Sequence, residues 1–201
     1  MKATLIILAG GKSLRLGRIK ALETIGGESL IERVVERLKP IADRILIVTS
    51  PEQIDFPVSG EVEIIVDLYP GRGPLGGIYT GLWYSRSPLS IIVACDMPFI
   101  NADLMEYMVG ISEDYDVIVP RLKNGMLEPL HAVYSRTCLN KMEIRLKKNE
   151  LGVHPFLETV NVRYINQAEI QKFDPQLLSF FNINYLSDID KANAIIAKEK
   201  N

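Results

Sequence analysis

TLIILAGG, residues 4–11, is an aliphatic run that ends at two adjacent glycines. A short run of this kind is typical of a strand that is buried on both faces in a parallel sheet. Glycines directly after such a strand permit positive φ angles and a close approach of the backbone to a ligand. The stretch therefore predicts the first strand of an α/β fold, followed by a loop that can bind an anion.

The loop at residues 10–20 reads GGKSLRLGRIK and combines three glycines with one hydroxyl and four cations. Backbone N–H groups in such a loop can converge on phosphates, and Arg15 and Lys20 can neutralise the phosphate charge. The loop has neither the Walker A spacing nor the dinucleotide fingerprint G-x-G-x-x-G. We interpret it as a nucleotide-binding loop of another kind. The alternative is a glycine-rich turn that carries solvated cations.

The composition is that of a globular chain. Of its 201 residues, 47% are hydrophobic and 24% are charged, so we expect a substantial core in a single domain spanning residues 1–201. A net charge of −2 argues against a broad surface for nucleic acid or for anionic membranes. The sequence leaves the oligomeric state open.

The cysteines and the N-terminal apolar run indicate a cytoplasmic protein. Cys95 and Cys138 are the two cysteines, and neither belongs to a C-x-x-C pair, which disfavours a disulfide framework or a zinc site and suits a reducing compartment. The apolar run that ends at Ala9 is too short for the core of a signal peptide or for a membrane span.

Strand-like and helix-like segments alternate along most of the chain. After the first strand, strand patterns follow at residues 44–49, 62–66, 90–95, 117–119, 130–134 and 160–165. Helical patterns occupy about 30–38, 101–109, 137–146, 153–158 and 187–198, and the glycine-rich loop 71–77 opens another helix, on which Trp83 is expected to pack in the core. Such alternation predicts a mostly parallel sheet covered on both faces, that is, a three-layer α/β/α Rossmann-like domain. Its ligand crevice should lie at the carboxyl ends of the strands.

Asp96 follows the most continuous apolar strand, residues 90–95. A nucleoside triphosphate repels a second anion unless its charge is neutralised, and Mg²⁺ held by one or two carboxylates is the usual remedy. Asp96 is therefore the candidate magnesium ligand. The alternative is an ordinary turn residue before Pro98.

Four segments whose residues could bind a ligand or take part in catalysis follow strand ends or adjoin them. They are the loop 10–20, Asp67 with residues 73–77, residues 95–98 and residues 181–188. In order and spacing they resemble the motifs of the molybdenum cofactor guanylyltransferases, which are nucleotidyltransferases of GT-A-like Rossmann fold. The segment EPLHAVY, residues 128–134, also resembles a motif of that family, so the resemblance spans essentially the whole chain.

The resemblance implies transfer of GMP from GTP to the phosphate of molybdenum-carrying molybdopterin, with release of pyrophosphate. It implies direct attack on the α-phosphate, assisted by Mg²⁺ on Asp96, with Lys20 functional and Arg15 in contact with phosphate. A protein nucleophile is not required, because the acceptor's own phosphate can attack. The same resemblance allows transient contacts with other proteins of molybdenum-cofactor metabolism.

For the base, the resemblance implies that the backbone after the first strand and the Pro-Leu-x-Gly loop read guanine, together with Asp67. A carboxylate can accept hydrogen bonds from guanine N1 and N2. Related cytidylyltransferases have alanine where this chain has Gly10, which favours GTP. The implied nucleotide-binding residues are Leu8, Ala9, Gly10, Gly11, Lys20, Asp67, Pro74, Leu75, Gly77 and Asp96.

Near the C-terminus, Asn182 and Asn184 match the family and are implied to bind the acceptor, whereas Tyr185-Leu186-Ser187 departs from the usual Thr-Pro-acidic run. Asp188 is a candidate for a second metal ligand. Turn and cap chemistry is the alternative for the two asparagines.

Three other functions stay open. One is a cytidylyltransferase that acts on the same acceptor. Another is a guanylyltransferase that acts on a sugar phosphate or on adenosylcobinamide phosphate. The third is a non-catalytic nucleotide-binding subunit, against which the presence of both Lys20 and Asp96 argues.

Overall fold

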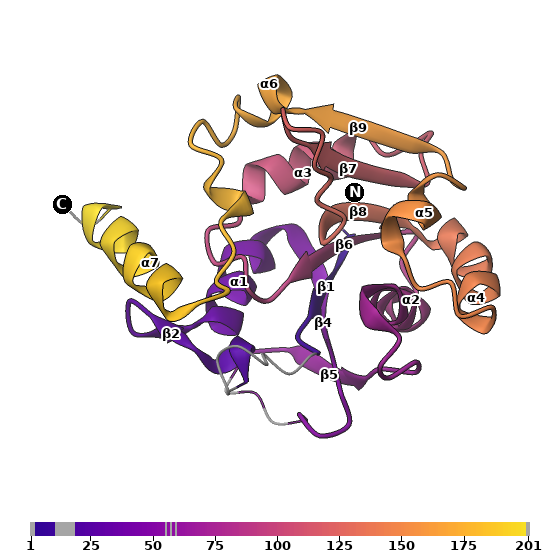
Figure 1. Ribbon diagram of the computed structural model, residues 1–201, viewed down its shortest axis with the longest axis horizontal. Coiled ribbons are helices and arrows are strands. Elements are labelled where there is room, and N and C mark those ends of the chain that lie inside the picture. The colour runs from indigo at the N-terminus through magenta and orange to yellow at the C-terminus, as the bar shows by residue number, and fades with distance from the viewer. Residues whose placement is uncertain (1–2, 11–18, 55, 57, 59, 200–201) are drawn as a thin grey trace.

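The computed structural model describes residues 3–10, 19–54, 56, 58 and 60–199, and its centre is a twisted sheet (Figure 1). Seven strands in this part of the chain form the sheet, in the order β5-β4-β1-β6-β8-β7-β9. Neighbouring strands are parallel except at β8, which runs antiparallel to both β6 and β7. The predicted mostly parallel sheet is thus confirmed. The strands are β1 (Ala3–Leu8), β4 (Ala42–Thr49), β5 (Val62–Val66), β6 (Leu89–Ala94), β7 (Val117–Arg121), β8 (His131–Ser135) and β9 (Val162–Asn166).

Helices cover both faces of the sheet and give the three expected layers (Figure 1). Side chains alternate along β1, so that Leu5 and Ile7 join one buried cluster and Ile6 joins another. Helices α1, α3 and α6 contribute to the first cluster, and α2, α4 and α5 contribute to the second. The helices are α1 (Leu30–Leu38), α2 (Gly73–Ser85), α3 (Ala102–Gly110), α4 (Leu139–Lys147), α5 (Val153–Leu157), α6 (Gln167–Ile170) and α7 (Leu186–Glu199).

Helix α1 coincides with the helix predicted at residues 30–38, and its first turn explains where it begins. Ser29 accepts a hydrogen bond from the N–H of Glu32, and the Glu32 carboxylate accepts one from the N–H of Ser29. This capping box satisfies two backbone donors that the helix itself leaves unpaired. Its buried face consists of Leu30, Ile31, Val34, Val35 and Leu38.

Helix α2 packs closely against β1 because Gly81 has no side chain. A Cβ at Gly81 would lie 2.3 Å from Cγ2 of Ile6, far inside a normal contact. Close packing of this kind fixes the whole helix relative to the strand. The helix begins at Gly73, whose φ of +65° is a left-handed conformation that glycine adopts without strain. The start of α2 is thereby held beside the carboxyl end of β1.

The sequence pattern did not indicate the direction of β8, which is antiparallel to both of its neighbours. Only residues 122–130 join β7 to β8, and this link contains no helix. A parallel neighbour needs a longer crossover connection, so the short link forces an antiparallel pair. A two-stranded hairpin, β2 (Thr24–Ile25) with β3 (Glu28–Ser29), was also not predicted, because strands this short carry no readable periodicity.

The position of Trp83 corrects the expectation that this side chain packs in the core. Its side chain is 51% exposed instead of lying in the core, and its ring stacks on Tyr79 with 6.1 Å between ring centroids. The buried face of α2 instead includes Leu75, Ile78 and Leu82. Trp83 therefore lies at the edge of the buried face of α2.

Helix α7 is held by a third buried cluster, which is separate from the two beside the sheet. Ala192 and Ile196 of α7 pack with Ile25 of the hairpin and with Phe99, which follows β6. Ile183, just before α7, belongs to the same cluster. The cluster therefore anchors the segment that precedes α7 near the end of β6.

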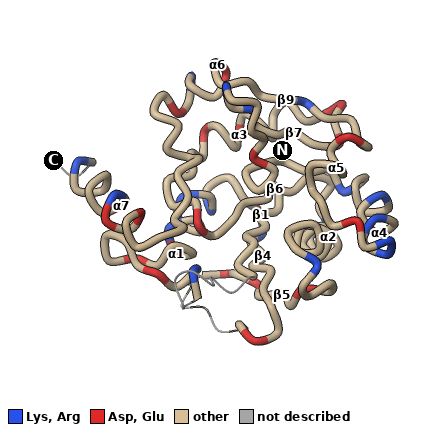
Figure 2. The backbone as a smooth tube through the Cα atoms, in the orientation of Figure 1, with Lys and Arg blue, Asp and Glu red and all other residues tan. Residues whose placement is uncertain are grey.

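Charged residues are interspersed along most elements, with a basic group on α4 (Figure 2). In that group Lys147 pairs with Glu143 at 2.8 Å, and Arg145 pairs with Glu150 at 3.2 Å. These two ion pairs between described residues therefore neutralise part of the positive charge of the basic group on α4. Among the helices in the described part of the chain, none combines the length and the apolar character needed to cross a bilayer.

Candidate active site

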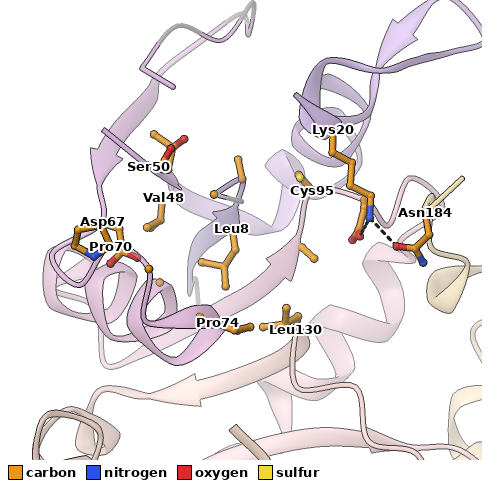
Figure 3. Close-up of a pocket in the computed structure, with 18 residues that line it drawn as sticks. Leu8, Lys20, Val48, Ser50, Asp67, Pro70, Pro74, Cys95, Leu130 and Asn184 are labelled. Carbon is orange, nitrogen blue, oxygen red and sulfur yellow. Dashed lines mark hydrogen bonds and ion pairs between the residues drawn. The ribbon is translucent and has the colours of Figure 1, made fainter. Parts of the chain in front are cut away.

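A cleft with a volume of about 710 Å³, here named the main cleft, lies where β1, β4, β5 and β6 end (Figure 3). Its position is the one expected for an α/β sheet, at the carboxyl ends of parallel strands. It is lined by Leu8, Ala9, Gly10, Lys20, Val48, Thr49, Ser50, Asp67, Pro70, Gly71, Gly73, Pro74, Gly77, Ala94, Cys95, Asp96, Leu130 and Asn184. Most of the predicted nucleotide-binding residues are in this set.

At one side of the main cleft, Lys20 joins two residues from distant segments. Lys20 opens the short 3₁₀ helix η1 (Lys20–Leu22), Asp96 follows β6, and Asn184 precedes α7. The Lys20 ammonium forms an ion pair with Oδ2 of Asp96 and donates a 2.9 Å hydrogen bond to Oδ1 of Asn184 (Figure 3). The Lys20 and Asp96 side chains are only 18% and 19% exposed, so their attraction is screened less than that of a surface pair.

The segment that carries Asn184 is fixed by hydrogen bonds of its own. The N–H of Ile183 donates to the carbonyl of Asp96 at 3.0 Å. The Asp188 carboxylate accepts from the N–H groups of Asn184 and Tyr185, each at 3.0 Å. The bond from Asn184 lowers the pKa of Asp188. Asp188 therefore caps the start of α7, and its role as a second metal ligand stays a prediction.

Asp96 has a free oxygen suited to a hard cation. Its Oδ1 is buried and has no hydrogen-bond partner among the described residues. Burying a carboxylate oxygen without a hydrogen-bond partner costs free energy unless a ligand contacts that oxygen. Groups of three or more potential metal-ligating side chains do not occur in the described part of the chain. A single carboxylate fits Mg²⁺, which is commonly held by one or two carboxylates together with substrate phosphates and water.

Asp67 lies on the opposite side of the main cleft and is held by several bonds. Its N–H donates to the carbonyl of Thr49 at 2.8 Å, which continues the pairing of β5 with β4. Its Oδ1 accepts from the N–H of Tyr69 at 2.9 Å and from the hydroxyl of Thr80 at 2.7 Å. The carboxylate is therefore fixed at the wall of the cleft before any ligand binds.

The first turn of α2 completes that wall. Gly73, Pro74 and Gly77 line the main cleft, whereas the side chain of Leu75 is fully buried in the core. The first N–H groups of a helix have no partner within the helix, so a Leu75 contact to ligand would use its backbone. Residues 71–76, which run from the loop after β5 into the first turn of α2, read G-x-G-x-x-G, a signal that a search confined to the first loop overlooks.

A second recess, the side hollow, adjoins the main cleft and has a volume of about 480 Å³. It shares Pro74, Ala94, Asp96, Leu130 and Asn184 with the main cleft. Its other lining residues are Met97, Glu128, Pro129, Leu151, Gly152, Val153, His154 and Asn182. Asn182 and Asn184 thus lie at this side of Asp96, and the Asn182 amide also donates to the carbonyl of Phe180 at 3.3 Å.

Glu128 is a site residue that sequence reasoning did not single out. It lines the side hollow, and burial together with the negative charge of Asp96 raises the pKa of its carboxyl. A carboxylate directly before the proline that leads into β8 was the available signal. Glu128 is therefore a second acidic residue, in addition to Asp96, in the lining of the side hollow.

Two buried side chains, those of Cys95 and His131, are held uncharged at pH 7 by their burial. Burial raises the pKa of the Cys95 thiol to about 12, which makes it a poor nucleophile. His131 is fully buried, and burial lowers its pKa to about 4, so it is neutral at pH 7. Gly11 and Arg15 lie outside the described residues, so their predicted contacts stay predictions.

The chain resembles proteins of one family over nearly its full length. The family model of the MobA-like NTP transferase domain matches residues 5–164. A probable molybdenum cofactor guanylyltransferase of Pelotomaculum thermopropionicum is 37% identical over 97% of this chain and 94% of the relative. The molybdenum cofactor guanylyltransferase of Desulfosudis oleivorans is also 37% identical, over 95% and 94% of the two chains.

A solved structure supports the same relationship. The crystal structure of molybdopterin-guanine dinucleotide biosynthesis protein A from Archaeoglobus fulgidus superposes with a TM-score of 0.84 at 30% identity, over 97% of this chain and 99% of that one. A family match over most of the sequence, relatives at this level of identity and a shared fold lead to one conclusion. The chain belongs to the family of MobA-like NTP transferases.

Proposed function

We propose that this protein transfers GMP from GTP to the phosphate of molybdenum-carrying molybdopterin and releases pyrophosphate. One observation carries the proposal beyond family membership. Lys20, Asp96 and Asn184 meet at the boundary between the main cleft and the side hollow. A donor nucleotide in one recess and an acceptor in the other would bring their reacting phosphates to this boundary.

The main cleft suits the donor nucleotide. Guanine presents donors at N1 and N2 and acceptors at O6 and N7. Asp67 supplies a fixed carboxylate for the donors, and the first turn of α2 supplies backbone N–H groups for the acceptors. The phosphates would then extend toward Lys20 and the loop at residues 10–20, in which Arg15 is a proposed phosphate contact.

Asp96 is the residue that would hold Mg²⁺. Its unpartnered Oδ1 is the observation that supports this assignment. The bound ion would neutralise phosphate charge and orient the triphosphate.

Lys20 provides the positive charge that the protein itself brings to the reacting phosphates. An ammonium group has three donors, and Lys20 uses two of them on Asp96 and Asn184. The third donor remains for a phosphate oxygen. In the reaction, an oxygen of the acceptor phosphate forms a bond to the α-phosphorus, and the bond from that phosphorus to the bridging oxygen breaks as pyrophosphate leaves. Lys20 stabilises charge during this exchange, and the protein supplies positioning without a covalent intermediate.

The side hollow suits the acceptor. Asn182 and Asn184 present amides that can donate to or accept from a polar ligand, and Leu130 and Leu151 provide an apolar wall. These features support a partly polar, partly flat acceptor such as a pterin. Transient contact with other molybdenum-cofactor proteins, and a location in the cytoplasm, remain predictions from the sequence.

The proposal is tested by magnesium-dependent pyrophosphate release with GTP and with CTP, each with and without molybdate-loaded molybdopterin. Release with GTP only in the presence of the pterin supports donor, acceptor and reaction together. Release with CTP instead would favour a cytidylyltransferase. If a sugar phosphate or adenosylcobinamide phosphate replaces the pterin and supports release, the acceptor assignment is wrong. Nucleotide binding without turnover on any acceptor would favour a binding subunit.

A further inference from the structure

Thr80 lies within α2 and is fully buried, yet its hydroxyl is engaged outside its own helix. It donates to Oδ1 of Asp67 at 2.7 Å and accepts from the N–H of Leu68 at 3.0 Å. A threonine in a helix commonly bonds to the carbonyl four residues earlier in the same helix. Here the hydroxyl instead ties α2 to the segment that follows β5.

This bond leaves the two oxygens of Asp67 unequal. Oδ1 accepts from both the Thr80 hydroxyl and the Tyr69 N–H, at 2.7 and 2.9 Å. A carboxylate oxygen has about two lone-pair sites, so these donors use the capacity of Oδ1. The structure gives Oδ2 no hydrogen bond to any described residue. Oδ2 is therefore the acceptor that Asp67 keeps for a ligand in the main cleft.

We infer that Thr80 is a positioning residue that sets base selectivity, because it fixes Asp67 so that one oxygen, Oδ2, reads the amino edge of the purine. This inference rests on the proposed function, in which Asp67 faces the donor base. It goes further by stating which oxygen reads the base and which residue outside the cleft lining holds that oxygen in place. Without the hydroxyl, the carboxylate could rotate and the Leu68 N–H would lose its acceptor.

The test compares the binding of GTP and ITP by calorimetry in the presence of Mg²⁺, because ITP lacks only the 2-amino group. We expect the wild-type protein to bind GTP about 10- to 100-fold more tightly, the range for one hydrogen bond to a charged group. Thr80→Val keeps the shape and removes the hydroxyl, and should lower this ratio by about tenfold. Thr80→Ser keeps the hydroxyl and should hold the ratio within about twofold.

Thr4 offers a matched control. It is also fully buried, its hydroxyl makes a 2.7 Å hydrogen bond to Ser87, and it lies at the opposite end of β1 from the cleft. Thr4→Val should therefore leave the GTP-to-ITP ratio unchanged even if it lowers stability. In an Asp67→Asn background, Thr80→Val should no longer alter the ratio, because Thr80 acts through Asp67.

The outcomes separate the inference from the proposed function. A folded Thr80→Val protein with the wild-type ratio overturns the inference and leaves the guanylyltransferase proposal intact. A wild-type protein that binds ITP as well as GTP, or binds neither, contradicts the proposed base assignment instead. If Thr80→Val does not fold, Thr80→Cys replaces it, since a thiol is only a weak donor. An unchanged ratio there would equally overturn the inference.

Discussion

The ammonium nitrogen of Lys20 lies 2.9 Å from Oδ1 of Asn184, although 164 positions separate the two residues in the chain. The same nitrogen pairs with Asp96, which follows the central strand β6. One positive charge is thus held between a carboxylate and an amide before any substrate arrives. A charge fixed in advance needs no reorganisation when the reaction develops negative charge.

Lys20→Ala should lower kcat by at least ~10²-fold, because the reaction loses that fixed charge. The measurement is the rate of pyrophosphate release at saturating GTP. Lys39→Ala is the control, since Lys39 is half-exposed and pairs only with Glu36 in the described structure. An unchanged kcat in Lys20→Ala would reassign this lysine to a structural role.

Asn184→Leu should lower kcat by about tenfold, because Lys20 loses the acceptor that orients it. Leucine has the same number and branching of side-chain heavy atoms as asparagine but has no hydrogen-bonding group. Asn182→Leu provides the contrast: its amide bonds to the carbonyl of Phe180 and has no described bond to Lys20, so it should change KM for the acceptor more than kcat. Identical kinetic effects in the two variants would argue against a separate orienting role for Asn184.

Asp96→Asn should abolish magnesium-dependent turnover, because the amide is a far weaker ligand for a hard cation than a carboxylate. The binding of Mn²⁺, followed by electron paramagnetic resonance in the presence of GTP, gives a readout that does not depend on turnover. Asp43→Asn, at an exposed position on β4, should bind Mn²⁺ like the wild type. Normal Mn²⁺ binding by Asp96→Asn would mean that another group holds the ion.

His131 should make the protein less stable in acid. Burial lowers its pKa to about 4 in the folded chain, whereas an unfolded histidine titrates near 6.5. The unfolded state therefore takes up the proton first as the pH falls below about 6.5, and stability declines until the folded form is protonated near pH 4. The loss should amount to about 3 kcal/mol.

His131→Leu should remove this part of the pH dependence. Both ring nitrogens of His131 lack hydrogen-bond partners among the described residues, so an apolar side chain of similar size sacrifices no bond there. Urea unfolding at pH 8 and at pH 5 measures the difference. His154→Gln is the control, because His154 is exposed. A wild-type pH dependence in His131→Leu would place the acid-sensitive group elsewhere.

Much of the site could be predicted from the sequence because α/β folds place ligands where strands end. Asp67 and Asp96 each follow an apolar run directly, so their place at the cleft followed from the strand pattern. Lys20 was recognised as a cation of the glycine-rich first loop, and its functional role was implied by the family resemblance. The three layers followed from the alternation of strand and helix patterns.

The rest depended on contacts that a local pattern does not contain. The direction of β8 is set by the length of a link rather than by strand composition. Thr80 looks like any buried helical residue until its partner Asp67, 13 positions earlier, is known. The bond from Lys20 to Asn184 requires α7 to be anchored against the hairpin and Phe99, a long-range packing event.

The anchoring of Asn184 beside β6 also has a consequence for protein synthesis. Synthesis proceeds from the N-terminus, so the strands of the sheet leave the ribosome before the segment that carries Asn184. A nascent chain that ends at β9 contains every strand of the described sheet, and it includes the whole segment matched by the family model, yet nothing in it can orient Lys20 from the Asn184 side. We expect such a chain to lack a complete site, so that catalytic competence arises only after the segment leading into α7 has been translated.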